Sequence, residues 1–363
     1  MLRLLSCGRT ARRVQPHSLE PAQLSLHDAA AAASSSSEHL IARIAASGGL
    51  EPSLRLALWP PLLKLVPWPS SISTDALDGA ALDAEYSALR ERAPGTVDAS
   101  LVRTIEADVP RTDSTLSRAQ LSALHDLLLA HCVLQPTWGY FQGMNDICRV
   151  VLSAHDASAA GGDAPAPRLG TAFFLLRGVL AHSSDNWAHA NLDGVWRQAR
   201  AVRRVLLCAD RKLMRHIDAV ERAASTGPRQ AMAKRGRGGG GGGGGRASDA
   251  PAPQQPFACL FGAIFLRLKR ELLSVEEAMR LWEVCWASGR HFHVLCLAAL
   301  VRRLRAELMR VRAEPSGAGE LHRLFGTLHG TQSAAALLEG ARALQATPGV
   351  ADALDSVMAS VNA

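Results

Sequence analysis

Apolar residues recur every three or four positions along most of this chain of 363 residues. That period places side chains on one face of an α-helix. The pattern is plain in three stretches, residues 121–132, 257–272 and 297–308. No stretch alternates apolar and polar residues for long enough to predict a strand. The sequence therefore predicts an all-α fold built from many helices of medium length.

Composition agrees with a helical fold and argues against metal sites, disulfides and transmembrane segments. Charged residues make up 20% of the chain and aromatic residues only 5%, while Ala, Leu and Arg, all good helix formers, are frequent. No two of the seven cysteines have C-x-x-C spacing, so we expect no metal site, no disulfide framework and a reducing compartment. The longest clean apolar run, residues 257–266, is half of the roughly 20 residues that a membrane span needs, and we expect no transmembrane segment.

The formal net charge of +7 is unevenly distributed along the chain. Residues 1–19 contribute +4 and residues 222–256 contribute +5, which leaves the remainder close to −2. The positive charge therefore belongs to two segments of low complexity rather than to the folded body. We expect no DNA-binding surface.

The breaks in composition predict three parts. Residues 1–47 form a disordered or targeting segment, residues 48–345 form the domain, and residues 346–363 form a C-terminal tail. Inside the domain we expect a disordered insertion at 223–256, because eight consecutive glycines, Gly238–Gly245, cannot bury enough surface to offset their backbone entropy. Residues 1–19 fit either an organelle transit peptide or an unstructured arginine-rich tail, and both interpretations stay open.

Residues 105–113, with the sequence IEADVPRTD, do not follow a helical pattern to their end. Pro110 lacks a backbone N–H and favours an extended conformation at Val109. We therefore expect Arg111 to leave the helical path and to stand on a loop, where its side chain can reach another molecule.

Residues 138–147, with the sequence WGYFQGMNDI, form a second unusual segment. Gly139 and Gly143 bracket three residues and allow a tight backbone. A helix can start at Met144. This arrangement predicts that Gln142 is presented outward, directly before that helix.

These two segments resemble the signature motifs of the TBC family of Rab GTPase-activating proteins. Four fixed positions of the first motif are matched by Ile105, Asp108, Arg111 and Thr112. Six positions of the second are matched by Tyr140, Gln142, Gly143, Met144, Asn145 and Asp146. Further landmarks occur in the family's order, among them Arg55 and Trp59 of an opening helix, and the resemblance covers roughly residues 48–330.

The resemblance implies a TBC-type domain in two helical halves and a role as GTPase activator rather than as an enzyme in its own right. Arg111 and Gln142 would be the two catalytic residues that the activator supplies to the GTPase. The family pattern implies supporting roles for Asp108, Thr112, Tyr140, Gly143, Asn145 and Asp146.

The partner implied is a Rab-family GTPase in its GTP-bound form, which would carry the GTP and the Mg²⁺; we expect no cofactor in this chain. It would act in the cytoplasm, transiently at endomembranes, in vesicle-mediated transport. A non-catalytic helical scaffold that binds a small GTPase is the alternative, but a scaffold needs neither Arg111 nor Gln142. An RNA-associated protein acting through the Gly/Arg insertion is another, disfavoured because the RGRGGG sequence occurs once and lacks interleaved aromatic residues.

Overall fold

The computed structural model describes residues 21–69, 71–72, 77–159, 169–188, 191–235, 257–289 and 291–359. These residues form α-helices and short 3₁₀ helices, with only isolated β-bridges between extended residues. The all-α prediction is confirmed. Within these ranges, no helix combines the length and the apolar character that crossing a membrane requires.

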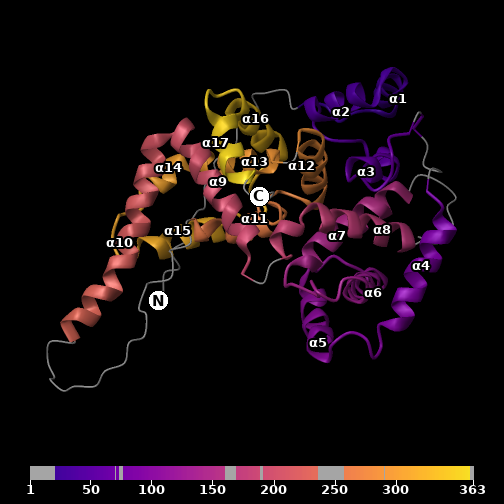
Figure 1. Cartoon of the computed structure of the whole chain (residues 1–363), viewed down its shortest axis with the longest axis horizontal. Helices are drawn as coiled ribbons and strands as arrows, with labels where there is room; N and C mark the ends of the chain where they lie inside the picture. Colours follow the sequence, from indigo (N-terminus) through magenta and orange to yellow (C-terminus); the bar gives the residue numbers. More distant parts are fainter. Residues whose placement is uncertain are drawn as a thin grey trace, which may run out of the picture.

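The first half of the fold lies on the right of Figure 1. Several of its helices begin at a Ser or Asp whose side chain accepts a hydrogen bond from the first turn, and Ser117 forms a capping box with Gln120. Helix α4 packs on α6 and α8, and α5 packs on α6. The elements are α1 (Leu26–Ser35), α2 (Ser37–Ala46), η1 (Pro52–Leu54), α3 (Arg55–Leu62), α4 (Gly79–Arg92), α5 (Ala99–Asp108), η3 (Val109–Arg111), α6 (Arg118–Leu134), α7 (Met144–Ala159) and α8 (Leu169–His182).

The second half lies mostly on the left of Figure 1, with α11 and α12 near the centre. Helix α13 packs on α9 and α16, and α12 contacts α7 of the first half. The elements are η4 (Ser184–Asn186), α9 (Asp193–Ala209), α10 (Arg211–Arg235), η5 (Ala258–Leu260), α11 (Phe261–Phe265), α12 (Val275–Ala287), α13 (Phe292–Arg303), α14 (Arg305–Leu308), α15 (Gly317–Gly326), α16 (Ala334–Gln345) and α17 (Val350–Met358).

The prediction of a disordered or targeting segment at 1–47 is wrong from residue 21 onward. The Ala/Ser run forms α1 and α2, because alanine is the best helix former and Ser36 caps α2 through its side chain. Leu40 and Ile44 of α2 are fully buried, and α2 packs on α12. Residues 1–20, and with them the choice between transit peptide and tail, lie outside the described residues.

Two other predicted boundaries are also wrong. Residues 346–359 are not a free tail, since α17 packs on α9 and buries Val350, Leu354 and Met358; residues 360–363 of the predicted tail lie outside the described residues. The predicted disordered insertion at 223–256 begins too early, because α10 continues to Arg235. Residues 229–235, with the sequence RQAMAKR, are all good helix formers. The rest of that insertion, 236–256, lies outside the described residues.

The regular spacing at 257–272 does not produce one continuous helix. Helix α11 ends at Phe265, and Arg267 and Leu268 adopt left-handed backbone angles, with φ of 52° and 64°. Such angles cost a residue with a side chain about 1–3 kcal/mol and persist only where the surrounding structure imposes them. The chain turns sharply here, and this turn faces the residues predicted to be functional.

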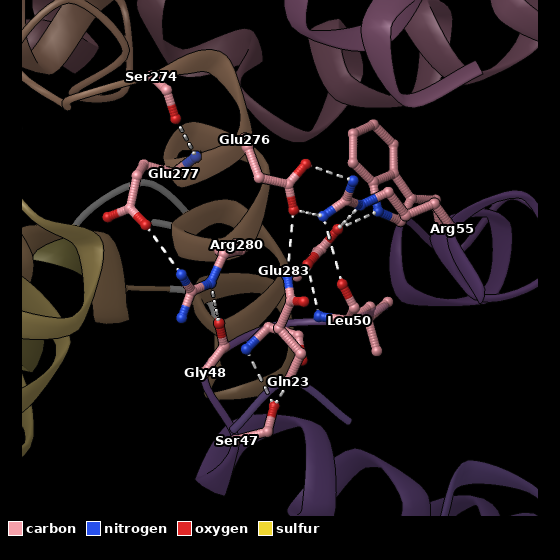
Figure 2. Close-up of polar contacts among 12 residues, drawn as sticks. Gln23, Ser47, Gly48, Leu50, Arg55, Ser274, Glu276, Glu277, Arg280 and Glu283 are labelled. Atoms are coloured by element: carbon pink, nitrogen blue, oxygen red, sulfur yellow. Dashed lines mark hydrogen bonds and ion pairs between the residues drawn. The ribbon is translucent and has the colours of Figure 1, made fainter. Parts of the chain in front are cut away.

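A buried ion cluster joins the beginning of the domain to α12, as Figure 2 shows. The Arg55 side chain is fully buried and donates from Nε to Glu283 Oε1 (2.7 Å) and from Nη1 to Glu276 Oε2 (2.8 Å). Glu283 also accepts from the Leu50 N–H (2.7 Å) and from Trp59 Nε1 (2.9 Å). Burial opposes the charge on Arg55, but the two carboxylates outweigh it and raise its pKa. Arg55 and Trp59 thus have structural roles in the fold.

The buried His131 of α6 makes the fold sensitive to acid. Its side chain is 1% exposed, and neither ring nitrogen has a hydrogen-bond partner among the described residues. Burial lowers its pKa from 6.5 to about 4, so between these values the unfolded chain binds a proton that the folded chain does not. Stability must therefore fall as the pH falls through this window, by about 2 kcal/mol between pH 7 and pH 5 from this group.

We expect a His131→Leu variant to lose that share of the pH dependence. The free energy of unfolding, measured by urea titration at pH 7 and pH 5, should differ between the two pH values by about 2 kcal/mol less than in the wild type. His125, half-buried on the same helix, provides the control, because His125→Leu leaves His131 in place. An unchanged pH dependence in His131→Leu would show that His131 is not the source.

Candidate functional site

The segment with Arg111 differs from its predicted conformation but displays the side chain as expected. Val109 is helical (φ −55°, ψ −49°), and α5 passes directly into η3, which ends at Arg111. Pro110 is tolerated because it lies in the first turn of η3, where its missing N–H costs no helical hydrogen bond. The prediction of an extended Val109 and a loop is wrong. The Arg111 side chain is nevertheless 67% exposed.

The segment with Gln142 has the predicted tight backbone. Gly139 and Gly143 have φ of 61° and 108°, and α7 begins at Met144. A Cβ atom at Gly143 would come within 2.7 Å of Leu266 Cδ2, so glycine is required there both by conformation and by space. Gln142 is exposed, directly before α7.

Asp108 brings the two segments together. Its carboxylate is buried, and Oδ1 accepts from Arg111 Nη2 (2.6 Å) and from Gln142 Nε2 (3.5 Å). Oδ2 accepts from the Tyr140 hydroxyl (2.9 Å). Arg111 and Gln142, 31 positions apart in the sequence, therefore meet at one carboxylate oxygen, on the same side of the molecule.

Arg111 is further fixed by the last turn of α5. Its Nε donates to the carbonyl oxygen of Ala107 at 2.8 Å. The guanidinium thus uses Nε and Nη2 for contacts within the chain, and Nη1 is not among these donors. A guanidinium held from one side can present its remaining N–H groups to another molecule.

Asn145 and Thr112 make a second connection between the segments. Asn145 Nδ2 donates to Thr112 Oγ1 (2.8 Å), and Asn145 Oδ1 accepts from the Gly143 N–H (3.0 Å). The Thr112 hydroxyl donates to the carbonyl oxygen of Asp108 (3.1 Å). Five of the six predicted supporting residues, Asp108, Thr112, Tyr140, Gly143 and Asn145, thus form one network around Arg111 and Gln142.

Tyr140 acts as a hydrogen-bond donor throughout the neutral pH range. Burial, reinforced by the hydrogen bond to Asp108, raises the pKa of its hydroxyl well above the usual value. The hydroxyl also lies 3.0 Å from Asn145 Oδ1. A protonated Tyr140 therefore supports the negative charge of Asp108 and leaves Oδ1 of that carboxylate to Arg111 and Gln142.

Asp146, the sixth supporting residue, makes different contacts. Its carboxylate is 4% exposed and accepts from Lys269 Nζ (2.6 Å) and from Arg270 Nε (3.1 Å) and Nη2 (2.7 Å). These two cations come from the turn after α11, in the second half of the fold. The motif spacing gave no indication of this contact, and neither cation was predicted to belong to the site.

A groove of about 540 Å³ lies beside this network. Arg111 and Thr112 line one part, while Lys269 and Arg270 line another, so both halves of the fold contribute. It is open to solvent and is the place where a protein segment could approach Arg111. The described part of the chain contains no group of three or more His, Cys, Asp or Glu side chains that could hold a metal ion.

Comparison with known proteins gives consistent matches. Residues 52–224 match the Rab-GTPase-TBC domain family. The chain is 25% identical over 281 residues to TBC1 domain family member 17 of Mus musculus, covering 72% of this chain and 36% of that protein. It is 21% identical over 321 residues to the GTPase-activating protein gyp7 of Schizosaccharomyces pombe, covering 80% and 37%. The chain thus spans little more than a third of the length of these relatives.

Solved structures share the fold. The Ypt/Rab-GAP domain of Gyp1p superposes with a TM-score of 0.58 at 16% identity, over 82% of this chain and 89% of that one. The Chlamydomonas flagellar RabGAP TBC domain superposes with a TM-score of 0.55 at 18% identity, over 85% of each chain. The two helical halves seen here are therefore a known architecture.

Proposed function

Because these comparisons confirm the resemblance of the chain to the TBC family of Rab GTPase-activating proteins, in sequence and in fold, we propose that it accelerates GTP hydrolysis by a Rab-family GTPase. In this proposal Arg111 and Gln142 are the catalytic residues. The partner, in its GTP-bound form, brings the nucleotide and Mg²⁺, since this chain has no G-x-x-x-x-G-K-[ST] sequence of its own.

The chemistry of GTP hydrolysis suits these two side chains. Negative charge develops on the γ-phosphoryl oxygens and the β–γ bridge, and the attacking water must be held in line. A guanidinium stays protonated and offers several N–H donors in a plane, which matches that charge. A carboxamide can accept a hydrogen bond from the water and donate one to a phosphoryl oxygen at the same time.

The observation that carries the proposal is the shared oxygen of Asp108. Arg111 and Gln142 reach it from separate segments at 2.6 and 3.5 Å. Both side chains are exposed, and Arg111 lines a groove that a partner can enter. Holding both groups before the partner arrives reduces the entropy lost when the transition state forms.

A single-turnover assay with a panel of purified Rab GTPases tests the proposal. GTP hydrolysis by at least one Rab should be strongly accelerated when this protein is added. If no Rab responds, the proposal is wrong. Binding of a GTP-loaded Rab without acceleration would instead support the non-catalytic scaffold. In this proposal the reaction takes place in the cytoplasm at endomembranes and regulates vesicle-mediated transport.

The RNA-associated alternative has its own test. The Gly/Arg segment at 236–256 lies outside the described residues, and deleting it should leave GTPase activation unchanged if the proposal holds. RNA binding that disappears with this deletion and weakens steeply with salt would favour the alternative.

Shortening Gln142 provides a more specific test. In Gln142→Asn the amide is retained but withdrawn by one methylene, so it no longer reaches the attacking water. We expect a loss of roughly 10²-fold in the hydrolysis rate, the scale of effect of a misplacement of about 1 Å. Gln345→Asn, at an exposed glutamine of α16, should leave the rate unchanged. Equal rates for Gln142→Asn and wild type would contradict the assigned role.

A further inference from the structure

The end of α11 and the turn that follows it contact the Gln142 segment at three points. The ring of Phe265 lies edge-on to that of Phe141, with centroids 6.4 Å apart. Leu266 fills the space beside Gly143. Lys269 and Arg270 then hold Asp146 through three hydrogen bonds of 2.6–3.1 Å. Phe141, Gly143 and Asp146 are thus each contacted by residues between 265 and 270 of the other half.

The backbone of this turn is shaped for the contact. The left-handed angles at Arg267 and Leu268 reverse the chain, so that the pair Lys269 and Arg270 faces the start of α7. Non-glycine residues adopt such angles where neighbouring contacts impose them, and functional sites collect such positions. No glycine relieves the turn.

The two cations are also closely coupled to the catalytic network. Asp146 follows Asn145, whose amide bonds Thr112 next to Arg111. A shift of Asp146 would therefore move Asn145, whose Oδ1 accepts a hydrogen bond from the Gly143 N–H. Gly143 would move with it, and so would its neighbour Gln142. Lys269 is 10% exposed and Asp146 4%, so water does not screen this ion pair as it does one at the surface.

We propose that Lys269 and Arg270 are positioning residues, which act through Asp146 to hold the turn at 139–145 so that Gln142 stands beside Arg111. This inference rests on the proposed function above and extends it to the second half of the fold. The first half carries both catalytic side chains, and the second half sets the position of one of them.

The test replaces both cations by neutral side chains of similar length, Lys269→Met with Arg270→Gln. The rate of GTP hydrolysis is measured against GTPase concentration, which separates kcat from KM. We expect kcat to fall by about 10–100-fold, because Gln142 is misplaced in the transition state, while KM changes by less than about twofold. Arg270→Lys keeps the charge but loses one of the two hydrogen bonds to Asp146, so its kcat should lie between those of the wild type and the double variant.

The matched control is Arg305→Gln. Arg305, on α14, forms an ion pair with Asp210 (Nε to Oδ2, 2.7 Å) away from this turn. It should keep the wild-type kcat and KM. A raised KM with an unchanged kcat in the double variant would show that the two cations contact the partner, and would overturn the positioning role.

Hydrogen exchange of the amides at 139–147 gives a readout that needs no GTPase. We expect faster exchange in the double variant than in wild type or Arg305→Gln. Unchanged exchange would overturn the inference even if the activity fell. If the wild-type protein activates no Rab, the proposed function fails, and the exchange result still decides whether these cations hold the turn.

Discussion

An Arg111→Lys variant is expected to fold like the wild type and to lose most of its acceleration of GTP hydrolysis. Lysine keeps the positive charge but has no planar set of donors with which to span the γ-phosphoryl oxygens and the bridging oxygen. An arginine supplied by an activator contributes about 10³–10⁵ in rate, or about 4–7 kcal/mol of barrier. We expect Arg111→Ala to lose this whole factor and Arg111→Lys to lose at least about 10²-fold of it.

The exposure of Arg111 allows an effect on catalysis to be separated from an effect on folding. Arg111 is 67% exposed, and Arg111→Lys keeps a positive charge beside the buried Asp108, which also accepts a hydrogen bond from Tyr140, so we expect this variant to fold. Single-turnover hydrolysis at saturating activator measures the effect, with thermal unfolding to verify the fold. Arg92→Lys, at an exposed arginine that ends α4, is the matched control. Full activity in Arg111→Ala would refute the catalytic assignment.

The largest effect on stability is expected from Glu283→Gln. Both carboxylate oxygens of Glu283 are acceptors: Oε1 for Arg55 Nε and Trp59 Nε1, and Oε2 for the Leu50 N–H. In either orientation, the NH₂ group of a glutamine would point at a donor, and the buried Arg55 would lose one of its two counter-charges. Breaking a buried ion pair in this way costs about 3–5 kcal/mol.

Urea unfolding at pH 7, followed by circular dichroism, measures the change. Glu320→Gln is the control, because Glu320 pairs loosely with Arg323 (4.0 Å) at the surface and its loss should cost less than about 1 kcal/mol. A cost for Glu283→Gln as small as that of the control would mean that the buried cluster contributes little.

The sequence predicted the parts of the site that are close together along the chain. Ile105 to Thr112 and Tyr140 to Asp146 each form a short pattern, and the positive φ values of Gly139 and Gly143 follow from a residue type that tolerates them. The prediction of an extended conformation at Val109 failed. A residue before proline usually avoids helical angles, but here α5 continues into η3 and Val109 keeps them.

The sequence could not predict contacts across long separations. Lys269 and Arg270 lie 123 and 124 positions from Asp146, and no local pattern marks them as partners of that carboxylate. The same holds for α1 and α2: their Ala/Ser composition resembles a linker, and only burial against α12 shows that they belong to the fold. Local propensity indicates where a helix can form, and packing decides what it covers.

Glu283 contacts residues that are distant in the sequence, and this limits how the protein can be shortened for laboratory work. Its partners Leu50 and Arg55 lie 233 and 228 positions earlier, whereas the match to the Rab-GTPase-TBC domain family covers only residues 52–224. A recombinant piece trimmed to those limits would discard α12 and leave a guanidinium and an indole N–H facing an empty interior. Expression trials should therefore keep residues 21–359 together and place any solubility tag outside them.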